Sequence, residues 1–254
     1  MANKRKKARP KTAKTLFVSL LLLIVFTATA GNVDLTRIDL NDLSSIVEVF
    51  ETRNTLADYP QLDSLPDYNG DDEVVTLNDN HPFFSEEDLS LNDGTWQTFS
   101  DLDTKNRVGQ ANAMLHKKMM PKKERGDIAQ VYPSGWKQKK TTDGQWLYNR
   151  SHLIGFQLTG ENDNWKNLFT GTQQMNQGPM REYEEEVATY LKESDHHVRY
   201  RVTPLFKEGE LVPRGVEMEA QSVEDDQLQF NIYIYNVQED YQINYETGTS
   251  KKAS

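Results

Sequence analysis

Charge is distributed along this chain in unequal blocks, and that distribution limits what each block can fold into. Residues 31–90 carry 15 acidic and two basic residues, together with three prolines. Because so charged a stretch can bury little apolar surface, it is expected to be a largely disordered, solvated tether, with at most one short element near residues 46–50. It is interpreted as a spacer, and the alternative is a polyanion mimic that lies over a basic groove.

The first 30 residues form a second block of opposite charge. Residues 1–14 hold seven basic residues and no acidic one, and an apolar run over 16–26 ends at Ala28-Thr29-Ala30. This pattern predicts an export signal over 1–30, since the alanines have the small-x-small form of a cleavage site. The apolar part is short of the roughly 20 residues that span a bilayer, so a cleaved signal peptide is favoured over a retained N-terminal membrane anchor.

Net charge alone would argue against a nucleic-acid partner, since the chain sums to −10. Within the remaining block, 91–254, however, residues 105–150 hold 11 basic and three acidic residues, which would suit a phosphate backbone. A solvated face looks the same in sequence. The candidate substrate contacts are Lys117, Lys118, Lys122 and Arg125, with Arg181 further along the chain.

The chain contains no cysteine. Disulfide scaffolds, thiolate metal sites and thiol catalysis are therefore excluded, and any metal must rest on oxygen and nitrogen ligands.

Residues 91–254 are predicted to form one α+β domain with a mixed, mainly antiparallel sheet, because strand and helix patterns occur without regular βαβ alternation. Strands are expected at 146–148, 198–202 and 228–234 from their alternating apolar residues. Helices are expected at 108–120, closed by Pro121, and at 180–191, begun by Pro179. Turns are expected at 101–107 and 133–136.

One cluster of polar residues carries the chemistry of a candidate site. Between residues 149 and 184 the chain offers a base, a cation, a hard-metal oxygen ligand and a carboxylate, in His152, Arg150, Asn176 and Glu184. Phosphodiester hydrolysis needs an activated water, a cation near the phosphate and charge neutralisation at the leaving oxygen. Mg²⁺ keeps most of its waters, so one amide oxygen from the protein can suffice. A lone histidine is nonetheless often only structural.

Several separated blocks, in order, give the chain a family resemblance over residues 95–248. It resembles the DNA/RNA non-specific endonucleases with a ββα-metal motif, in particular the membrane-attached DNA-entry nucleases and secreted DNases of streptococci and related Gram-positive bacteria. The blocks include Pro133-Ser134-Gly135-Trp136, Asn149-Arg150-Ser151-His152-Leu153-Ile154-Gly155, Lys166-Asn167-Leu168 and Met175-Asn176-Gln177.

The resemblance implies a role for each matching residue. His152 would be the general base, Asn176 the Mg²⁺ ligand and Arg150 a contact near the phosphate. Asn167 would support the site, and Glu184 would hold a metal-bound water. Eight residues of continuous helix rise about 12 Å, so Glu184 lies too far from Asn176 to share one metal's inner shell, unless Gly178-Pro179 bends the chain.

Three positions depart from the family pattern. Asn149 and Ser151 replace the usual Asp and Gly of the motif, and Gly171 stands where some relatives have glutamine. The uncharged amide alters the field at Arg150 or His152 without removing the base or the metal ligand. Trp136, Trp146 and Trp165 are interpreted as packing residues at the edges of the site, with base stacking as the alternative.

The resemblance implies an exported, Mg²⁺-dependent endonuclease that cleaves DNA and RNA without sequence preference and leaves 5′-phosphate ends, with Mn²⁺ as a substitute metal. It would be extracellular, either secreted or anchored to the outer face of the cytoplasmic membrane of a Gram-positive bacterium. Two alternatives remain: a catalytically impaired cell-surface DNA-binding protein, and a structural spacer or adhesin that uses the acidic region.

Overall fold

The computed structural model of the chain describes residue 65 and residues 67–253. The export signal predicted over 1–30, and the predicted tether up to residue 64, lie outside the described residues. In the part of the chain that is described, no helix combines the length and apolarity needed to cross a membrane.

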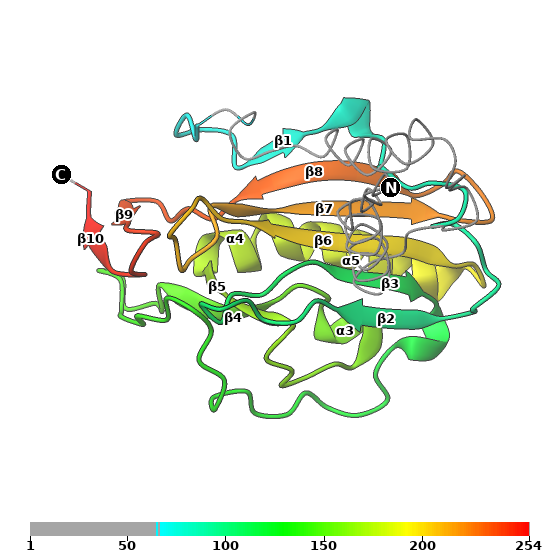
Figure 1. Cartoon of the computed structure of the whole chain (residues 1–254), viewed down its shortest axis with the longest axis horizontal. Coiled ribbons are helices and arrows are strands. Elements are labelled where there is room, and N and C mark those ends of the chain that lie inside the picture. Colours follow the sequence, from blue (N-terminus) through cyan, green and yellow to red (C-terminus); the bar gives the residue numbers. More distant parts are fainter. Residues whose placement is uncertain (1–64, 66, 254) are drawn as a thin grey trace, which may run out of the picture. The chain divides into compact units, whose positions relative to one another are not determined.

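The described residues form an α+β fold, as predicted, and every strand pairing in it is antiparallel, where a mixed, mainly antiparallel sheet was expected. Figure 1 shows a main six-stranded sheet with the strand order β1, β8, β7, β6, β3, β2. Its strands are β1 (Val74–Thr76), β2 (Trp96–Phe99), β3 (Ala111–Leu115), β6 (Val198–Leu205), β7 (Gly215–Ser222) and β8 (Gln229–Tyr235).

Within the described residues, two small hairpins and five short or medium helices complete the fold. The hairpins pair β4 (Tyr148–His152) with β5 (Leu168–Thr172), and β9 (Tyr241–Ile243) with β10 (Ser250–Lys252). The helices are the 3-10 helices η4 (Asn78–Asn80) and η5 (Lys117–Met119), and the α-helices α3 (Phe156–Thr159), α4 (Gln173–Gln177) and α5 (Pro179–Glu193).

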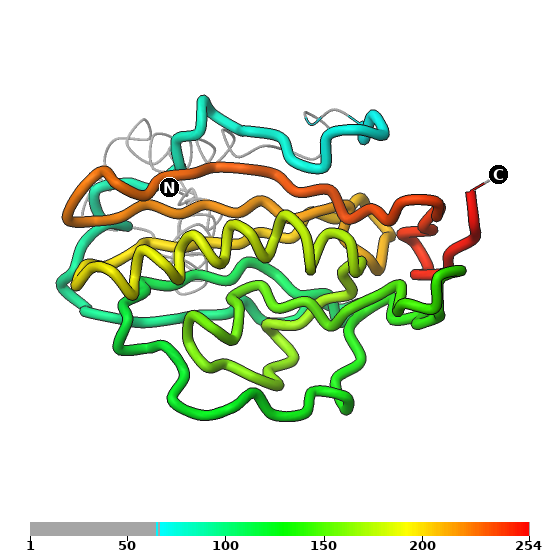
Figure 2. Tube along the Cα trace, turned by 180° about the vertical axis from the view of Figure 1, so that it is seen from behind, coloured from blue at the N-terminus to red at the C-terminus, as the bar shows by residue number. Residues whose placement is uncertain are grey.

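Helix α5 runs along one face of the main sheet (Figure 2). The helix turns Val187, Ala188 and Leu191 inward, and alternate residues of the strands, such as Met218 and Ile232, meet them in a single buried core. Removal of this apolar surface from water stabilises the helix on the sheet. It also fixes the position of α4 and Gly178, which precede α5 directly.

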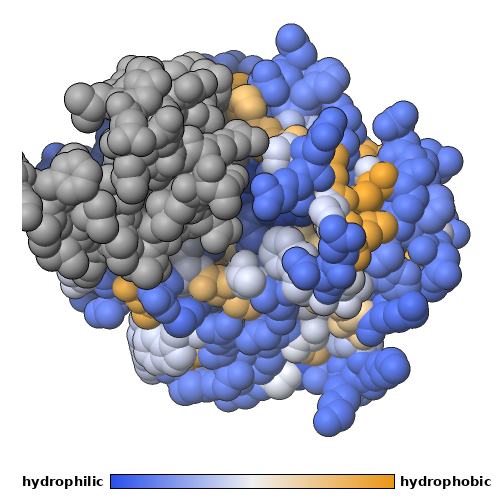
Figure 3. Space-filling model, turned by 45° about the vertical axis from the view of Figure 1, so that its right-hand side comes forward, coloured by the Kyte–Doolittle hydropathy of each residue, from blue (hydrophilic) through white to orange (hydrophobic). Residues whose placement is uncertain are grey.

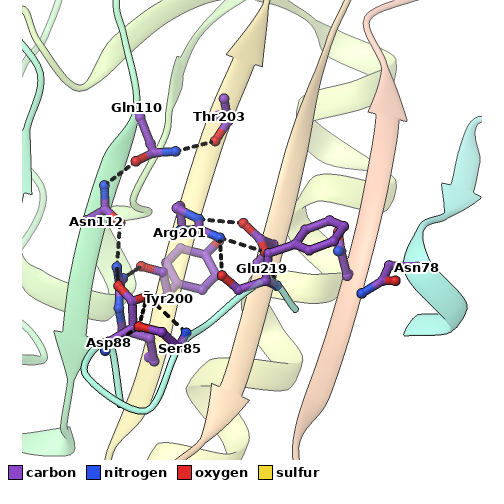
Figure 4. Close-up of polar contacts among 12 residues, drawn as sticks. Asn78, Ser85, Asp88, Gln110, Asn112, Tyr200, Arg201, Thr203 and Glu219 are labelled. Carbon is purple, nitrogen blue, oxygen red and sulfur yellow. Dashed lines mark hydrogen bonds and ion pairs between the residues drawn. The ribbon is translucent and has the colours of Figure 1, made fainter. Parts of the chain in front are cut away.

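The opposite face of the sheet is polar but still buried. Arg201 of β6 forms an ion pair with Glu219 of β7, and the Phe83 backbone N–H donates to the same carboxylate at 2.7 Å. The Phe84 ring lies 4.8 Å from the guanidinium of Arg199 and 4.7 Å from that of Arg201. Figure 4 shows this network, which satisfies charges that would be costly to bury alone.

The predicted boundary at residue 90 between tether and domain is therefore wrong. Strand β1 pairs with β8, and residues 83–88 pack over the polar face of the sheet. Among its acidic residues, Asp88 forms an ion pair with the buried Arg199 of β6. The high acidic content of this stretch in the sequence therefore gave no indication that part of it packs on the sheet.

The predicted helix over 108–120 is also wrong. The chain forms β3 there, between β2 and β6, followed by η5. Ala, Met and Leu favour helices intrinsically, but pairing with strands on both sides overrides that preference. The Asn112 side chain accepts from Arg199 at 2.6 Å on the polar face, which a helix would not allow.

The other predicted elements are present. The helix at 180–191 is α5, the strands at 198–202 and 228–234 are β6 and β8, and the strand expected at 146–148 lies slightly later, as β4. Turns occur within 101–107 and 133–136, as expected. On the face seen in Figure 3 the described surface is mostly hydrophilic, with small separate hydrophobic patches.

Candidate active site

A β-hairpin followed by a helix brings the candidate residues together. Strands β4 and β5 pair with Arg150 opposite Thr170 and His152 opposite Leu168. The chain then enters α4, whose first turn is capped by the Thr172 hydroxyl, which accepts from the Met175 N–H at 3.2 Å. Asn149 and Arg150 of β4 and Asn176 of α4 therefore line the same groove, of about 520 Å³.

The groove is cationic and rich in amides and aromatic rings. Arg125 and Arg150 supply its charge, and no residue that lines it is acidic among those described. Tyr132, Trp136 and Trp146 contribute aromatic rings to its walls. A groove of this composition is suited to a phosphate-bearing ligand.

His152 is not among the residues that line this groove but contacts one of them, Arg125, and it is almost fully buried, with 6% of its surface exposed. Its Nε2 lies 2.8 Å from the Asn162 carbonyl oxygen, which can only accept, so Nε2 carries the proton and Nδ1 the lone pair. Burial lowers the pKa of His152 to about 4; the Asn162 carbonyl opposes this shift and the Arg125 charge adds to it. The imidazole is therefore neutral at pH 7, with Nδ1 as a base.

Arg125 connects His152 with Glu184. Its Nη2 is 3.4 Å from His152 Nδ1, and its charge also acts on the Glu184 carboxylate. Burial raises the pKa of Glu184 to about 8, against the opposing effects of a Gln157 hydrogen bond and Arg125. A Cβ at position 155 would lie 2.5 Å from Glu184 Oε2, so Gly155 leaves room for this carboxylate.

Asn167 holds the chain that follows His152. Its side chain accepts from the Ile154 N–H at 2.9 Å and donates to the Ile154 carbonyl at 3.0 Å, and its own carbonyl accepts from Leu153 at 2.9 Å. All three bonds are buried. The expected supporting role thus has a geometric basis, because these bonds fix the backbone on the C-terminal side of His152.

Arg150 shapes the wall of the groove. Its guanidinium donates to the backbone carbonyls of Val131 and, at 2.7 Å, Ala129. The same group lies 4.4 Å from the Trp136 ring centre and 5.4 Å from that of Tyr132. Arg150 is therefore a residue that orders the 129–136 loop as well as a charge in the groove.

Asn176 and its surroundings fit a hydrated hard cation. Among residues 67–253 there is no cluster of three or more His, Cys, Asp or Glu side chains that could hold a metal ion. A metal bound at Asn176 would therefore be coordinated mainly by water and phosphate oxygens. Mg²⁺ binds proteins in this way, whereas a structural Zn²⁺ takes four protein ligands. Asn149 lines the same groove, and its buried Nδ2, which has no hydrogen-bond partner in the described structure, is a donor that suits a phosphate oxygen and not the cation itself.

The helix break that could bring Glu184 closer to Asn176 is present. Gly178 has φ −97° and ψ −115°, and it separates α4 from α5. Glu184 nonetheless contacts Gly155 and is not among the residues that line the groove. The expectation that it acts outside the inner shell of a metal stays a prediction.

The predicted substrate contacts are not brought together. Arg125 lines the groove, whereas Lys117 pairs with Asp195 at 3.1 Å, beyond the C-terminal end of α5. The helix alone is about 20 Å long, so Lys117 lies far from Asn176. Lys118 and Lys122 lie outside the groove lining, and Arg181 pairs with Glu185 at 2.6 Å.

Three features of the site were not predicted from the sequence. The Asn162 contact is made by a backbone carbonyl, which no residue type signals, and Arg125 was expected to bind substrate without any indication that it contacts His152. Tyr132 was also missed as a groove residue. Each is supplied by a loop whose path only the folded chain defines.

The motif departure at Ser151 has a packing explanation. A Cβ added at Gly171, on the paired strand, would overlap Ser151 Oγ and lie 2.8 Å from Met175 Cε. The serine hydroxymethyl group therefore fills space that the glycine on β5 leaves. A small residue at 171 compensates for the larger residue at 151.

The stability of this pair can be tested. Gly171→Ala is expected to lower the free energy of unfolding by about 1–3 kcal/mol through overpacking. Adding Ser151→Gly should recover most of that loss, because it removes the overlapping atoms. Urea unfolding of both single variants and the double variant measures the coupling. A double variant no more stable than Gly171→Ala would contradict this account.

Comparison with known proteins agrees with this geometry. The family model for DNA/RNA non-specific endonuclease matches residues 89–224. The metal-free NucA of Streptococcus agalactiae is 28% identical, with a TM-score of 0.66 over 80% of this chain and 96% of that one. NucA with magnesium bound is 27% identical, with a TM-score of 0.66 over 80% of this chain and 97% of that one. The zinc-bound Sda1 nuclease shares the fold, at 24% identity and a TM-score of 0.55 over 62% and 82% of the respective chains.

Proposed function

The chain belongs to the DNA/RNA non-specific endonuclease family, and we propose that it is an exported, Mg²⁺-dependent member that uses His152 as general base and leaves 5′-phosphate ends. The observation that carries the proposal is the buried, neutral His152, whose proton is fixed on Nε2 beside a cationic groove. Both DNA and RNA are proposed as substrates. Low sequence preference follows if most contacts are made to phosphates.

In the proposed reaction, His152 Nδ1 takes a proton from the attacking water. Arg125 Nη2 now lies near that nitrogen, so a bound phosphate would have to draw Arg125 toward itself and leave room for the water. The Asn162 carbonyl keeps the Nε2–H oriented while Nδ1 gains the proton, and it stabilises the imidazolium that forms. Asn167 keeps the following backbone in place.

The metal is proposed to rest on Asn176. Mg²⁺, or Mn²⁺ in its place, would neutralise charge on the phosphate and on the departing 3′ oxygen. The metal-bound NucA neighbour supports magnesium, since that protein was obtained with a magnesium ion bound. Arg150 then needs to supply only part of the positive charge in the groove. This is consistent with its guanidinium already donating to two backbone carbonyls.

Export is proposed from the basic and apolar residues at the N-terminus, as a cleaved signal or as a retained anchor on the outer face of a Gram-positive cytoplasmic membrane. A shortened protein in the medium would support the cleaved signal. An intact N-terminus on the cells would support the anchor. The residues between this segment and the folded domain are proposed as an acidic spacer.

A direct assay tests the enzyme. The purified full chain is incubated with supercoiled plasmid and with RNA, in Mg²⁺ and in EDTA. We expect nicked and fragmented products only with Mg²⁺, and ends that polynucleotide kinase labels only after phosphatase treatment. DNA that is retarded in a gel but intact would favour the second candidate, a catalytically impaired surface DNA-binding protein. The observation behind that candidate is Asn149, which replaces the usual Asp of the motif.

The pH profile should reflect the low pKa of His152. The base is unprotonated at any pH above about 4, so kcat/KM should fall only as the pH drops toward that value. Arg125→Met removes a nearby positive charge that disfavours the imidazolium, so the acid limb should move to higher pH. Arg125→Lys keeps the charge and serves as the control. An acid limb that stays in place in Arg125→Met would exclude this coupling.

A further inference from the structure

Exposed aromatic side chains are concentrated at the groove. In the described part of the chain, only Leu91, Tyr132, Trp146 and Trp165 are large hydrophobic residues with substantial exposure. Tyr132 is 61% exposed and Trp146 is 52% exposed, and both line the groove that contains Arg150 and Asn176. Exposed rings forgo the stabilisation that burial of a large apolar side chain provides, so a binding role is a physical reason to keep them.

Cations hold these rings in place. Lys140 Nζ lies 5.0 Å from the Trp146 ring centre, and the two residues are joined by a β-bridge. Arg150 lies 5.4 Å from the Tyr132 ring centre and is itself fixed by hydrogen bonds to the 129–131 backbone. Each ring is thus positioned next to a positive charge, so a nucleotide could stack its base and place its phosphate close by.

We propose that Trp146 and Tyr132 form a stacking platform for the base of an unpaired nucleotide, next to the phosphate site. The proposal rests on the nuclease function and names the substrate class it favours: single-stranded or locally unpaired nucleic acid. Bases within a duplex have both faces covered by their neighbours, so they cannot stack on these rings without leaving the helix. Because every base has a π-face, the platform leaves cleavage independent of sequence.

The platform is tested by binding, in the full chain carrying His152→Ala so that the probe is not cut. Fluorescence anisotropy at fixed salt compares a labelled 12-residue oligothymidylate with an abasic oligonucleotide of the same length. Stacking of one base contributes about 1–3 kcal/mol, so the oligothymidylate should bind about 5- to 150-fold more tightly. Equal affinity for the two probes, or no binding of either at low salt, would overturn the platform.

Substitutions at the tryptophans test whether the Trp146 ring stacks on the base. Trp146→Ala should remove most of the difference between the probes and leave the affinity for the abasic oligonucleotide nearly unchanged, whereas Trp146→Phe should retain part of the difference. Trp165→Ala is the matched control, because Trp165 is 47% exposed but lies outside the groove lining. If Trp165→Ala has the same effect as Trp146→Ala, or if both probes weaken equally in Trp146→Ala, the proposal is wrong.

Cleavage by the otherwise unaltered chain separates this proposal from the nuclease function. Trp146→Ala should lower kcat/KM at least 5-fold more for single-stranded DNA than for a duplex of the same sequence. Failure of the parent chain to cut either substrate would refute the nuclease proposal and leave the binding comparison intact. If Trp146→Ala folds normally by circular dichroism and loses kcat/KM equally on both substrates, the stacking platform is refuted and the nuclease proposal is not.

Discussion

His152→Ala is expected to lower kcat for plasmid cleavage about 10²- to 10⁴-fold, the range that a positioned general base contributes. The imidazole is neutral at pH 7 because burial lowers its pKa to about 4, and Asn162 leaves Nδ1 as the basic nitrogen. The variant retains Arg125, Arg150 and Asn176 in the groove. The loss should therefore appear in kcat, with little change in oligonucleotide affinity.

A second histidine controls for loss of a ring. His81 is exposed, and its Nδ1 contacts the Asp79 carbonyl in the turn that follows β1, so His81→Ala should cleave at the parent rate. Undiminished cleavage by His152→Ala would rule out the assigned mechanism. A loss of oligonucleotide binding equal to the loss of rate would instead indicate that His152 acts through the shape of the groove.

Helix α5 and the two long strands β6 and β8 could be predicted from sequence because each has one apolar face in a regular period. Pro179 begins the helix, and Val187 and Leu191 repeat on one side of it. Strand β7 has the same period, with Val216 and Met218 alternating with acidic residues, but no strand was expected there. Its Glu219 is buried as the ion-pair partner of Arg201 on the neighbouring strand.

Strand β3 could not be predicted from its own residues. Its Ala, Met and Leu content favours a helix, and the decisive interactions are with Trp96–Phe99 and with β6, whose paired residues lie 83 to 91 positions further along the chain. The segment 83–88 failed for a related reason. Its acidic residues all look solvated in sequence, and only the ion pair with Arg199 shows that Asp88 packs on the sheet.

The sequence motif indicates which residues could carry the chemistry, but it does not indicate which other residues surround them in the folded chain. His152, Asn167 and Asn176 could be proposed from sequence because the hairpin and the following helix keep them within 25 residues of each other. Arg125 and the Asn162 carbonyl contact His152 from two loops. The number of basic residues in the sequence does not indicate either contact. Lys117 shows the converse, since it belongs to the same basic block yet pairs with Asp195.

Asn176→Ala should have the second large effect, on the metal dependence of cleavage. The amide is the one protein oxygen ligand proposed, and the described residues offer no acidic cluster that could replace it. We expect the Mg²⁺ concentration for half-maximal activity to rise by about 100-fold or more, since even residues that only support a metal ligand change metal affinity 10- to 100-fold. A Mg²⁺ titration of the cleavage rate measures this.

Asn176→Asp separates loss of the ligand from damage to the groove. It keeps an oxygen at the same position and adds a negative charge, so it should retain Mg²⁺ dependence and require no more Mg²⁺ than the parent chain. The side chain lies after the capped first turn of α4, so neither substitution removes a cap or a buried apolar contact. If Asn176→Ala and Asn176→Asp show the same Mg²⁺ requirement as the parent, the metal does not rest on this residue.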